Sequence, residues 1–277
     1  MTIKETLAQA SECLSSANIS SARLDAELLL AHVLKKNRVF LLTHGEKPLA
    51  PSRLKTYRAL IGKRFKHYPL AYLTGHKGFY GLDFLVTPDV LVPRPESELI
   101  IDLVKGMDTT DALLVDVGTG SGCLPITLAP YFKKVIALDI SGKALLVAGK
   151  NARKHARKNI RFIESDLLTK LPKLSDVPKL IITANLPYVT AAEIKAEPSI
   201  QKEPRLALYG GPDGLTLYRR LAIQLSELKK QYPLLPITLI CEINPRQKNG
   251  LKKVWSKNKI DFKKDVAGKT RLGVATI

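Results

Sequence analysis

The stretch "LLVDVGTGSG", residues 113–122, decides the fold. Its first half is a short apolar run typical of a buried strand, and its second half is a glycine-rich turn that leads into apolar residues from Cys123 onward. A buried strand that passes through a tight glycine turn into a helix is the opening unit of a wound α/β sheet. Glycines also let a ligand approach the backbone closely. An ordinary tight turn would use the same glycines, so both interpretations stay open here.

The rest of the C-terminal part repeats this pattern. Short runs rich in Val, Ile and Leu are separated by amphipathic or basic stretches long enough for helices, which predicts a parallel sheet wound with helices. These runs are "KVIALDI" (134–140), "IRFIES" (160–165), "KLIITAN" (179–185) and "PITLICEI" (236–243). The final stretch, residues 261–277, has two apolar segments around a Gly-Lys turn and is expected to close the sheet as a hairpin.

The N-terminal part has a different texture. Residues 1–71 contain "DAELLLAHVL" (25–34) and "PSRLKTYRALIGKRF" (51–65), whose apolar spacing and early proline predict helices. Residues 72–95 are rich in glycine, proline, aromatic and β-branched residues, which indicates a β-hairpin linker. We therefore expect a helical recognition domain over 1–71, the linker over 72–95, and a main domain over 96–277.

Composition narrows the class of protein. Of 277 residues, 45% are hydrophobic and 25% charged, as in ordinary globular proteins. No apolar run approaches the roughly 18 residues of a membrane span, and the N-terminus does not resemble a signal peptide, so we expect a cytoplasmic protein without a membrane partner. Cys13, Cys123 and Cys241 lie far apart and the histidines are scattered, which predicts neither a disulfide framework nor a metal site. The net charge of +19 fits a nucleic-acid or ribosomal partner, or simply a solvated lysine-rich surface.

Acidic residues stand where the next two strands should end. Asp139 follows Gly120 by 19 residues, at the end of the neighbouring strand, where a carboxylate can accept both ribose hydroxyls of a nucleoside. Asp166 follows the third strand, where it could receive an adenine amino group. Aspartate in such turns also commonly caps a helix.

The fourth strand runs into "ANLPYV", residues 184–189. The amide oxygen of Asn185 and the backbone carbonyl of Leu186 could accept both hydrogens of a substrate –NH2 group and so orient its nitrogen. Tyr188 could stack on the flat group that carries this nitrogen, and Pro187 would stiffen the loop. An ordinary Asn-x-Pro turn is the alternative.

These motifs, in this order, resemble class I S-adenosylmethionine-dependent methyltransferases that methylate a planar amino or amide nitrogen. The linker block "PLAYLTGHKGFYGLDFLVTPDVLVPRPESE", together with "EPRLALYGGPDGLTLYRRL", "CEINPRQ" and "DVAGKTRLGVA", extends the resemblance over nearly the whole chain. With these blocks the chain is similar to the peptide chain release factor glutamine N5-methyltransferases.

The resemblance implies a fold, a reaction and a site. The fold would be a class I, Rossmann-like methyltransferase domain with a mainly parallel seven-stranded sheet. The reaction would transfer a methyl group from S-adenosylmethionine to the glutamine amide nitrogen (N5) in the Gly-Gly-Gln motif of bacterial peptide chain release factors 1 and 2. The enzyme would release S-adenosylhomocysteine, act as a monomer and need no nucleic-acid substrate. The implied cofactor-binding residues are Gly118, Thr119, Gly120, Ser121, Gly122, Asp139, Asp166, Leu167 and Asn185, and the implied catalytic residues are Asn185, Leu186, Pro187 and Tyr188.

The chain departs from the family pattern in a few places. Leu186 stands where the family most often has a second proline, and Asn-Leu-Pro-Tyr also resembles the loop of ribosomal RNA adenine dimethyltransferases. Methylation of an exocyclic amino group of a base in RNA or DNA is therefore the alternative function. About 90 residues precede the cofactor domain and match the glutamine-modifying family, which favours the first function. Ser97 replaces the usual threonine, and Asn244 and Pro245 replace glycine; we expect these changes to touch no proposed contact.

Three further features have no settled role in the sequence. Arg94, Glu96 and Glu98, in "VPRPESE", could brace the wall of the site, contact the loop of the substrate, or simply belong to a salt-bridged helix start. Asp213 and Arg219 belong to the resemblance, but their roles do not follow from it. A catalytically silent binding module on the same fold would have lost cofactor residues, and none is missing.

Overall fold

The computed structural model describes residues 1–256 and 258–277, which form two compact units. The first unit comprises residues 1–76 together with the short segment 198–202, and the second comprises 77–197 and 203–277. The segment 198–202 lies far along the sequence from the rest of its unit, and no local pattern indicated this. The three-part division proposed from sequence, 1–71, 72–95 and 96–277, stays an interpretation.

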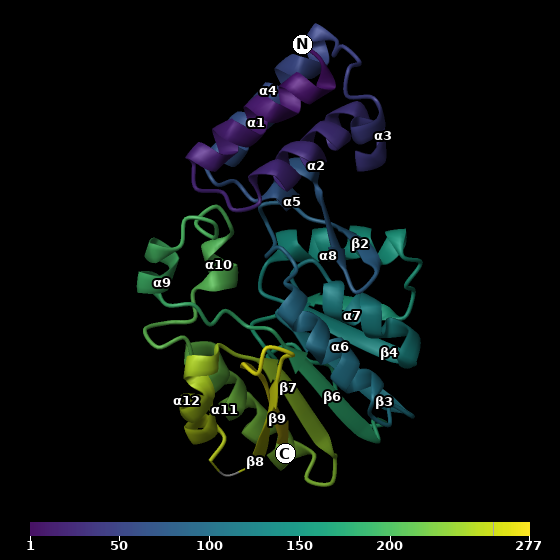
Figure 1. Ribbon diagram of the computed structural model, residues 1–277. Helices are drawn as coiled ribbons and strands as arrows, with labels where there is room; N and C mark the ends of the chain where they lie inside the picture. The colour runs from purple at the N-terminus through teal and green to yellow at the C-terminus, as the bar shows by residue number, and fades with distance from the viewer. Residues whose placement is uncertain (257) are drawn as a thin grey trace. The chain divides into compact units, whose positions relative to one another are not determined.

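The first unit is built of helices around its own apolar core (Figure 1). Its first helix begins with a capping box, in which the Thr2 hydroxyl accepts from the Glu5 amide and the Glu5 carboxylate accepts from the Thr2 amide. The helix predicted over 51–65 has those bounds in the structure. The helices are α1 (Ile3–Ser16), α2 (Ala22–Leu34), α3 (Arg38–Thr43), α4 (Pro51–Phe65) and α5 (Leu70–Thr74).

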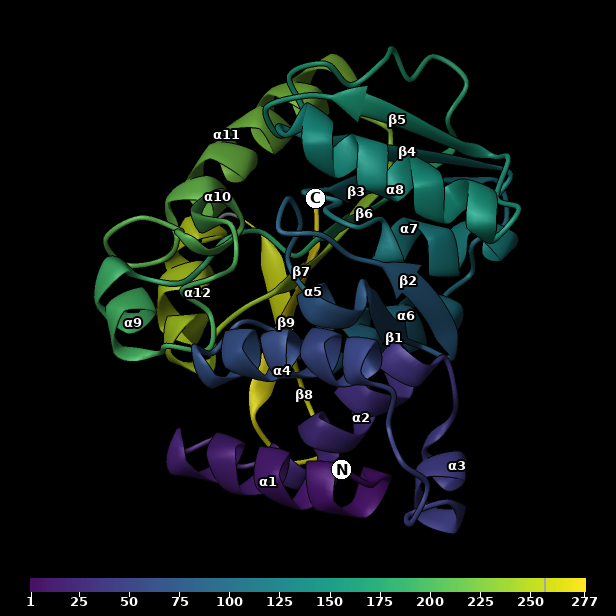
Figure 2. The ribbon, with the colours of Figure 1, turned by 90° about the horizontal axis from the view of Figure 1, so that it is seen from above.

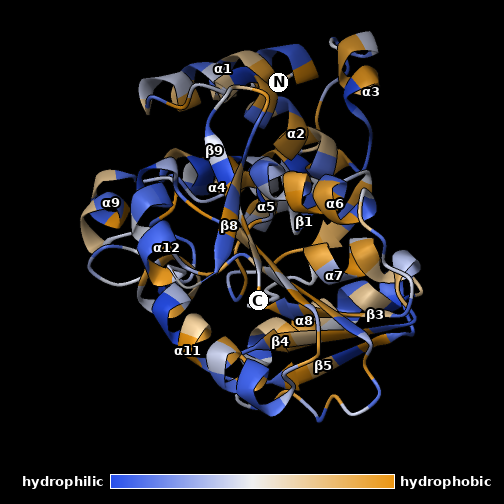
Figure 3. Cartoon of the chain, turned by 90° about the horizontal axis from the view of Figure 1, so that it is seen from below, coloured by the Kyte–Doolittle hydropathy of each residue, from blue (hydrophilic) through white to orange (hydrophobic). Residues whose placement is uncertain are grey.

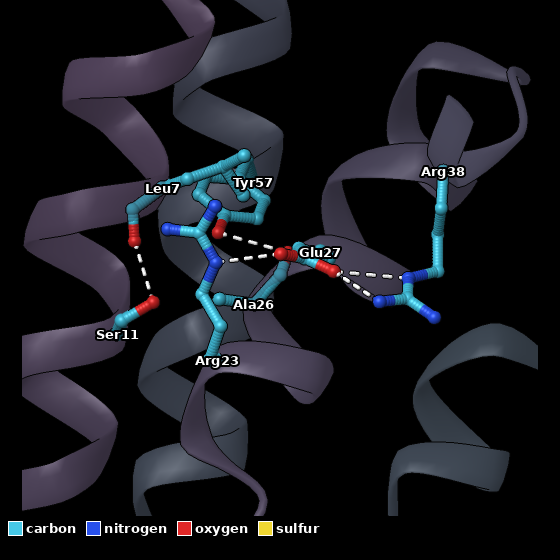
Figure 4. A network of polar contacts seen from close by, with 7 residues as sticks. All are labelled: Leu7, Ser11, Arg23, Ala26, Glu27, Arg38 and Tyr57. Atoms are coloured by element: carbon cyan, nitrogen blue, oxygen red, sulfur yellow. Dashed lines mark hydrogen bonds and ion pairs between the residues drawn. The ribbon is translucent and has the colours of Figure 1, made fainter. Parts of the chain in front are cut away.

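Polar contacts in and around a buried acid link three of these helices (Figure 4). The carboxylate of Glu27, on α2, accepts from Arg23 at 2.5 Å and from Arg38 of α3 at 2.6 Å. Beside it, the hydroxyl of Tyr57 on α4 donates to the carbonyl of Ala26 at 3.0 Å. A buried carboxylate is tolerated only when it is paired in this way, so we interpret the cluster as structural.

The second unit contains the expected seven-stranded sheet (Figure 1). The strand order is β5-β4-β3-β6-β7-β9-β8; the first five of these strands run parallel, and β9 runs antiparallel to both β7 and β8. The predicted C-terminal hairpin is confirmed as β8–β9. The strands are β3 (Ala112–Val117), β4 (Lys134–Asp139), β5 (Ile160–Glu164), β6 (Lys179–Ala184), β7 (Ile237–Glu242), β8 (Lys259–Lys264) and β9 (Thr270–Thr276).

Helices cover both faces of the sheet, because the central strands are apolar on both sides (Figures 2 and 3). One core joins strand residues such as Leu114 to α6 and α7, and the other joins residues such as Val115 to α11 and α12. The helices are η1 (Pro95–Ser97), α6 (Glu98–Lys105), α7 (Cys123–Leu128), η2 (Ala129–Tyr131), α8 (Gly142–Lys154), α9 (Ala191–Ala196), α10 (Arg205–Leu208), α11 (Thr216–Gln231), η3 (Pro245–Gln247) and α12 (Lys248–Val254).

The hairpin expected between residues 72 and 95 is present as β1 (His76–Phe79) and β2 (Leu82–Leu85). Its two-residue turn places Tyr80 at φ 47° and Gly81 at φ 74°, the backbone that a tight hairpin requires. Tyr80 accepts this strained conformation because its amide donates to Glu98 at 2.8 Å and its hydroxyl to Asp102 at 2.7 Å. These two hydrogen bonds attach the turn to α6.

Within the part of the chain that the structure describes, no helix has the length and hydropathy of a membrane span.

Candidate active site

A cavity of about 610 Å³ opens at the carboxyl ends of β3, β4 and β6 in the second unit. The chain moves outward from β3 in both directions here, so the cavity occupies the switch point where α/β sheets bind ligands. Of the predicted site residues, only Gly122 and Tyr188 are absent from the described lining of this cavity. The predicted residues that line it are Gly118, Thr119, Gly120, Ser121, Asp139, Asp166, Leu167, Asn185, Leu186 and Pro187.

The glycine loop has the geometry that its composition predicts. Gly118, Gly120 and Gly122 have φ values of 75°, 53° and 79°, a region that other residues rarely adopt. A Cβ atom on Gly120 would meet nothing within 4 Å, so the backbone there is open to the cavity. A Cβ atom on Gly122 would lie 2.8 Å from Ile126, so this glycine serves helix packing.

Asp139 joins the end of β4 to the glycine loop. Its Oδ2 accepts from the Gly120 amide at 2.8 Å, and its Oδ1 accepts from the Ser141 amide at 2.9 Å. Burial raises the pKa of Asp139, while these two backbone hydrogen bonds act in the opposite direction. Each oxygen keeps a second lone pair, so the fixed carboxylate can still accept hydroxyl groups from a ligand.

Asp166 and Leu167 follow β5 at the rim of the cavity. Asp166 forms an ion pair of 2.5 Å with Arg220 of α11, a partner that the sequence did not indicate. Leu167 has a φ of 52°, which is strained for a leucine, and its carbonyl accepts the hydroxyl of Ser165 at 2.9 Å. The ion pair gives Asp166 a competitor for any ligand amino group.

The amide of Asn185 has a defined orientation. Its Nδ2 donates to the hydroxyl of Ser97 at 2.8 Å, and within the described residues its Oδ1 accepts no hydrogen bond. Asn185 lines the cavity, so Oδ1 is left as the acceptor for a ligand. The buried side chain of Leu186 packs against Gly118, where an added Cβ would lie 3.0 Å away. This packing accounts for a leucine beside the glycine loop.

The contact with Ser97 corrects one expectation. The substitution of serine at this position was expected to touch no proposed contact, and this was wrong because Ser97 holds the Asn185 amide. Ser97 in turn donates to the buried carboxylate of Glu242, at the end of β7, at 2.5 Å. Neither Ser97 nor Glu242 was in the predicted site, since 88 and 57 residues of sequence separate them from Asn185. A polar residue ending an apolar strand, as Glu242 does, was the one available signal.

The Tyr188 hydroxyl faces Glu242 and not the cavity. It donates to Glu242 at 3.1 Å, and the described residues that line the cavity do not include Tyr188. Burial raises the pKa of Tyr188, and the neighbouring Glu242 raises it further, so the phenol stays protonated as a donor. Stacking of Tyr188 on a substrate group stays a prediction.

The block "GGPDG", residues 210–214, packs against the Asn-Leu-Pro-Tyr loop. The Gly210 amide donates to the Val189 carbonyl at 2.9 Å, and Gln247 donates to the Tyr188 carbonyl at 2.8 Å. A Cβ atom on Gly214 would lie 2.1 Å from that same carbonyl oxygen. The glycines are therefore required by close packing against the loop.

Replacing Gly214 by alanine is expected to destabilise the protein by at least about 3 kcal/mol, because a strained backbone and an overpacked contact add up. Gly268 offers a matched control: its φ is 76° against 72° for Gly214, but its surroundings are empty within 4 Å. Gly268→Ala should cost only the backbone strain, about 1–2 kcal/mol. Urea unfolding of both variants measures the difference, and equal losses would refute the packing role.

Arg94 and Asp213, whose roles the sequence left open, each form an ion pair. Arg94 forms an ion pair with Glu203, whose other oxygen accepts from the Val92 amide at 3.0 Å, so the two walls of the cavity are linked. Asp213 accepts from the Leu215 amide at 3.1 Å and pairs with Arg219, which fixes the turn before α11.

Asp116, the aspartate of "LLVDVG", is fully buried below the glycine loop. Its Oδ1 accepts the Thr183 hydroxyl at 2.6 Å, and the buried Thr119 hydroxyl lies beside the same carboxyl. Burial raises the pKa of Asp116 to about 6, although the hydrogen bonds from Thr183 and Thr119 oppose this.

Asp116 should make stability depend on pH. The folded chain binds this proton more tightly than the unfolded chain, whose aspartate titrates near 3.8. The contribution is therefore complete below about pH 4 and is lost as pH rises through about 6, by about 3 kcal/mol. Asp116→Asn removes this dependence. The difference in unfolding free energy between wild type and variant should change by that amount from pH 4 to 7, and a flat difference would contradict it.

The comparisons with known proteins agree with this geometry. Residues 5–75 match a family described as "PrmC N-terminal domain", and residues 114–197 match one described as "Methyltransferase domain". The chain is 40% identical to the release factor glutamine methyltransferase of Moorella thermoacetica over 80% of its own length and 79% of the relative's. The corresponding enzyme of Leptospira interrogans is 38% identical over 98% of this chain and 96% of its own.

Solved structures show the same fold at low identity. The hMettl16 catalytic domain, solved with the MAT2A 3′UTR hairpin 1, superposes with a TM-score of 0.57 at 15% identity, covering 89% of this chain and 90% of that one. A methyltransferase from Pyrococcus furiosus gives a TM-score of 0.50 at 17% identity, over 72% and 90%. At these identities the likeness concerns the class I methyltransferase fold alone.

Proposed function

Since this chain belongs to the release factor glutamine methyltransferases, we propose that its cavity holds S-adenosylmethionine beside the glutamine of a release-factor Gly-Gly-Gln loop. The enzyme is an S-adenosylmethionine-dependent methyltransferase that methylates a release factor glutamine. We place the new methyl group on the N5 amide nitrogen and take release factors 1 and 2 as substrates. The identity to relatives over nearly the full length supports this assignment.

The cavity fits the cofactor in two respects. Gly120 leaves its backbone open to a ligand, and Asp139 presents a fixed carboxylate to ribose hydroxyls. When bound, S-adenosylmethionine supplies a methyl group on a positively charged sulfur, and S-adenosylhomocysteine is the product. The residues that we assign to it are Gly118, Thr119, Gly120, Ser121, Gly122, Asp139, Asp166, Leu167 and Asn185.

The observation that carries the proposal is the orientation of Asn185. With Nδ2 held by Ser97, Oδ1 can accept one hydrogen of the glutamine amide, and the carbonyl of Leu186 can accept the other. The amide nitrogen is a poor nucleophile because its lone pair is delocalised, so holding it in line with the methyl group is the main task, worth about 7 kcal/mol or more. The two acceptor oxygens also favour the positive charge that develops on this nitrogen.

The chemistry needs no nucleophilic side chain. Cys123 lines the cavity, but burial raises the pKa of its thiol to about 12, so it stays neutral. The methylated amide is acidic and can lose its proton to water. Pro187 would keep the loop stiff and Tyr188 would contact the flat amide group, both as proposals.

We also propose that the enzyme acts as a monomer. We further propose that the enzyme works in the cytoplasm, where release factors act, without a membrane or nucleic-acid partner. The net charge of +19 has no assigned role in this proposal.

The test is transfer of labelled methyl from S-adenosylmethionine to purified release factor. Two other acceptors run beside it: a factor whose Gly-Gly-Gln glutamine is alanine, and ribosomal RNA. Label on the wild-type factor alone supports the proposal. Label on RNA and on neither factor would replace it with methylation of a base amino group, the function that Asn-Leu-Pro-Tyr also fits.

A further inference from the structure

A chain of hydrogen bonds runs from the cavity wall into the core of the second unit. The Asn185 Nδ2 donates to the Ser97 hydroxyl at 2.8 Å, and this hydroxyl donates to Glu242 Oε2 at 2.5 Å. From the other side, the Tyr188 hydroxyl donates to Glu242 Oε1 at 3.1 Å. Ser97 and Glu242 are only 2% and 1% exposed, so water does not compete for the hydrogen bonds between them.

The direction of these bonds depends on the charge of Glu242. An ionised carboxylate only accepts, so the single proton of the Ser97 hydroxyl must point at Glu242. The oxygen of Ser97 is then left to accept, and only the Nδ2 group of Asn185 can donate to it. An ionised Glu242 therefore selects the amide orientation in which Asn185 Oδ1 is left for the cavity.

A protonated Glu242 removes this selection. The acid can then donate its own proton to the oxygen of Ser97, which frees the serine proton to point at Asn185. A side-chain amide that receives a proton must present Oδ1, so Asn185 turns over and shows its –NH2 group to the cavity. An –NH2 group there repels the hydrogens of the substrate amide instead of accepting them.

The surroundings of Glu242 determine which form prevails. Burial raises the pKa of Glu242, and the hydrogen bonds from Ser97 and Tyr188 lower it. Glu96 also raises it and Arg271 lowers it; Arg271 itself pairs with Glu96 and with Asp265. Among the described residues, the Tyr218 hydroxyl donates to the Glu242 carbonyl, and Cys123 and Cys241 are further titratable groups nearby. Arg94 lowers the pKa of Tyr188, the other hydroxyl that donates to this carboxyl.

We propose that Glu242 is a positioning residue for methyl transfer: acting through Ser97, it fixes the Asn185 amide with Oδ1 toward the acceptor nitrogen. This inference rests on the proposed function of Asn185, which it deepens. It assigns tasks to the buried side chains of Ser97, which lines the cavity, and Glu242, which lies behind it. It also explains why the Tyr188 hydroxyl donates a hydrogen bond to the buried Glu242.

The first test compares two substitutions of the same shape at Ser97. Threonine and valine are nearly isosteric, so Ser97→Thr and Ser97→Val crowd the site equally and differ in the hydroxyl. Ser97→Thr should keep kcat within about threefold of wild type, and Ser97→Val should lower kcat by about 10- to 100-fold. The KM for release factor, and the affinity for S-adenosylmethionine measured by calorimetry, should differ little between the two.

The second test is the pH dependence of kcat. The wild type should lose activity on the acidic side as Glu242 takes up a proton. Tyr188→Phe removes one of the two hydrogen bonds that favour ionised Glu242, so this acidic limb should move to higher pH. Glu242→Gln should lower kcat and abolish the limb, because glutamine does not titrate.

The outcomes separate the inference from the function on which it rests. If the wild type methylates release factor but Ser97→Val matches Ser97→Thr, or the acidic limb stays in place in Tyr188→Phe, the positioning role is overturned and the function stands. If the wild type labels no release factor, both fall together. A hydroxyl-dependent kcat together with a shifted limb supports the inference, since a purely structural role moves neither.

Discussion

Replacing Asn185 by alanine is expected to lower kcat for release factor methylation by at least about 10³-fold, while the affinity for S-adenosylmethionine changes by less than about fivefold. The substitution removes the oxygen that we propose orients the acceptor nitrogen, and orientation is the main contribution of the site to catalysis. Asn185 is also one of the nine residues that we assign to the cofactor, but the other eight remain in the variant, so the cofactor affinity should change little. Rates under saturating cofactor and calorimetric titration of the cofactor measure the two effects separately.

Asn185→Asp serves as the matched variant. Aspartate keeps oxygen acceptors at the same position but cannot donate to Ser97. We expect it to lose less activity than alanine, because an acceptor remains although its orientation is no longer fixed. An alanine variant that retains activity within tenfold of wild type would remove Asn185 from the catalytic set.

The second large effect is expected on cofactor binding. Asp139→Ala should raise the dissociation constant of S-adenosylmethionine by about 100-fold or more, because two hydrogen bonds to a charged acceptor are lost, each worth about 1.5–3 kcal/mol. The substitution also leaves the amides of Gly120 and Ser141 without their acceptor, so the glycine loop loses its anchor. Calorimetry gives the constant directly.

Glu164 provides the control for this prediction. It pairs in register with Asp139 on the neighbouring strand, but it is exposed and lies outside the described lining of the cavity. Glu164→Ala should leave cofactor affinity within about threefold of wild type. Equal effects of the two substitutions would mean that general acidity, and not the fixed carboxylate of Asp139, attracts the cofactor.

Much of the fold follows from local pattern. The strands β3 to β7 lie within one or two residues of the predicted apolar runs. These strands are continuous apolar runs because both faces are covered, and such runs separated by amphipathic stretches leave few alternatives to a wound parallel sheet. Pattern did not indicate that residues 198–202 belong with the N-terminal unit, because that association depends on contacts remote in sequence.

Some residues of the candidate site could likewise be identified from the sequence, and others could not. The glycine loop, Asp139 and Asn185 could be identified because each directly follows a strand, and parallel strands bring their ends to one edge. By itself the sequence therefore determined the wound sheet and the residues at its carboxyl edge. The tertiary structure alone decided that Ser97 and Glu242 stand behind Asn185, that Tyr188 faces them, and that Arg220 competes for Asp166. The physical reason is that a hydrogen bond requires two groups within about 3 Å, and for residues distant in sequence only the packed fold fixes that separation.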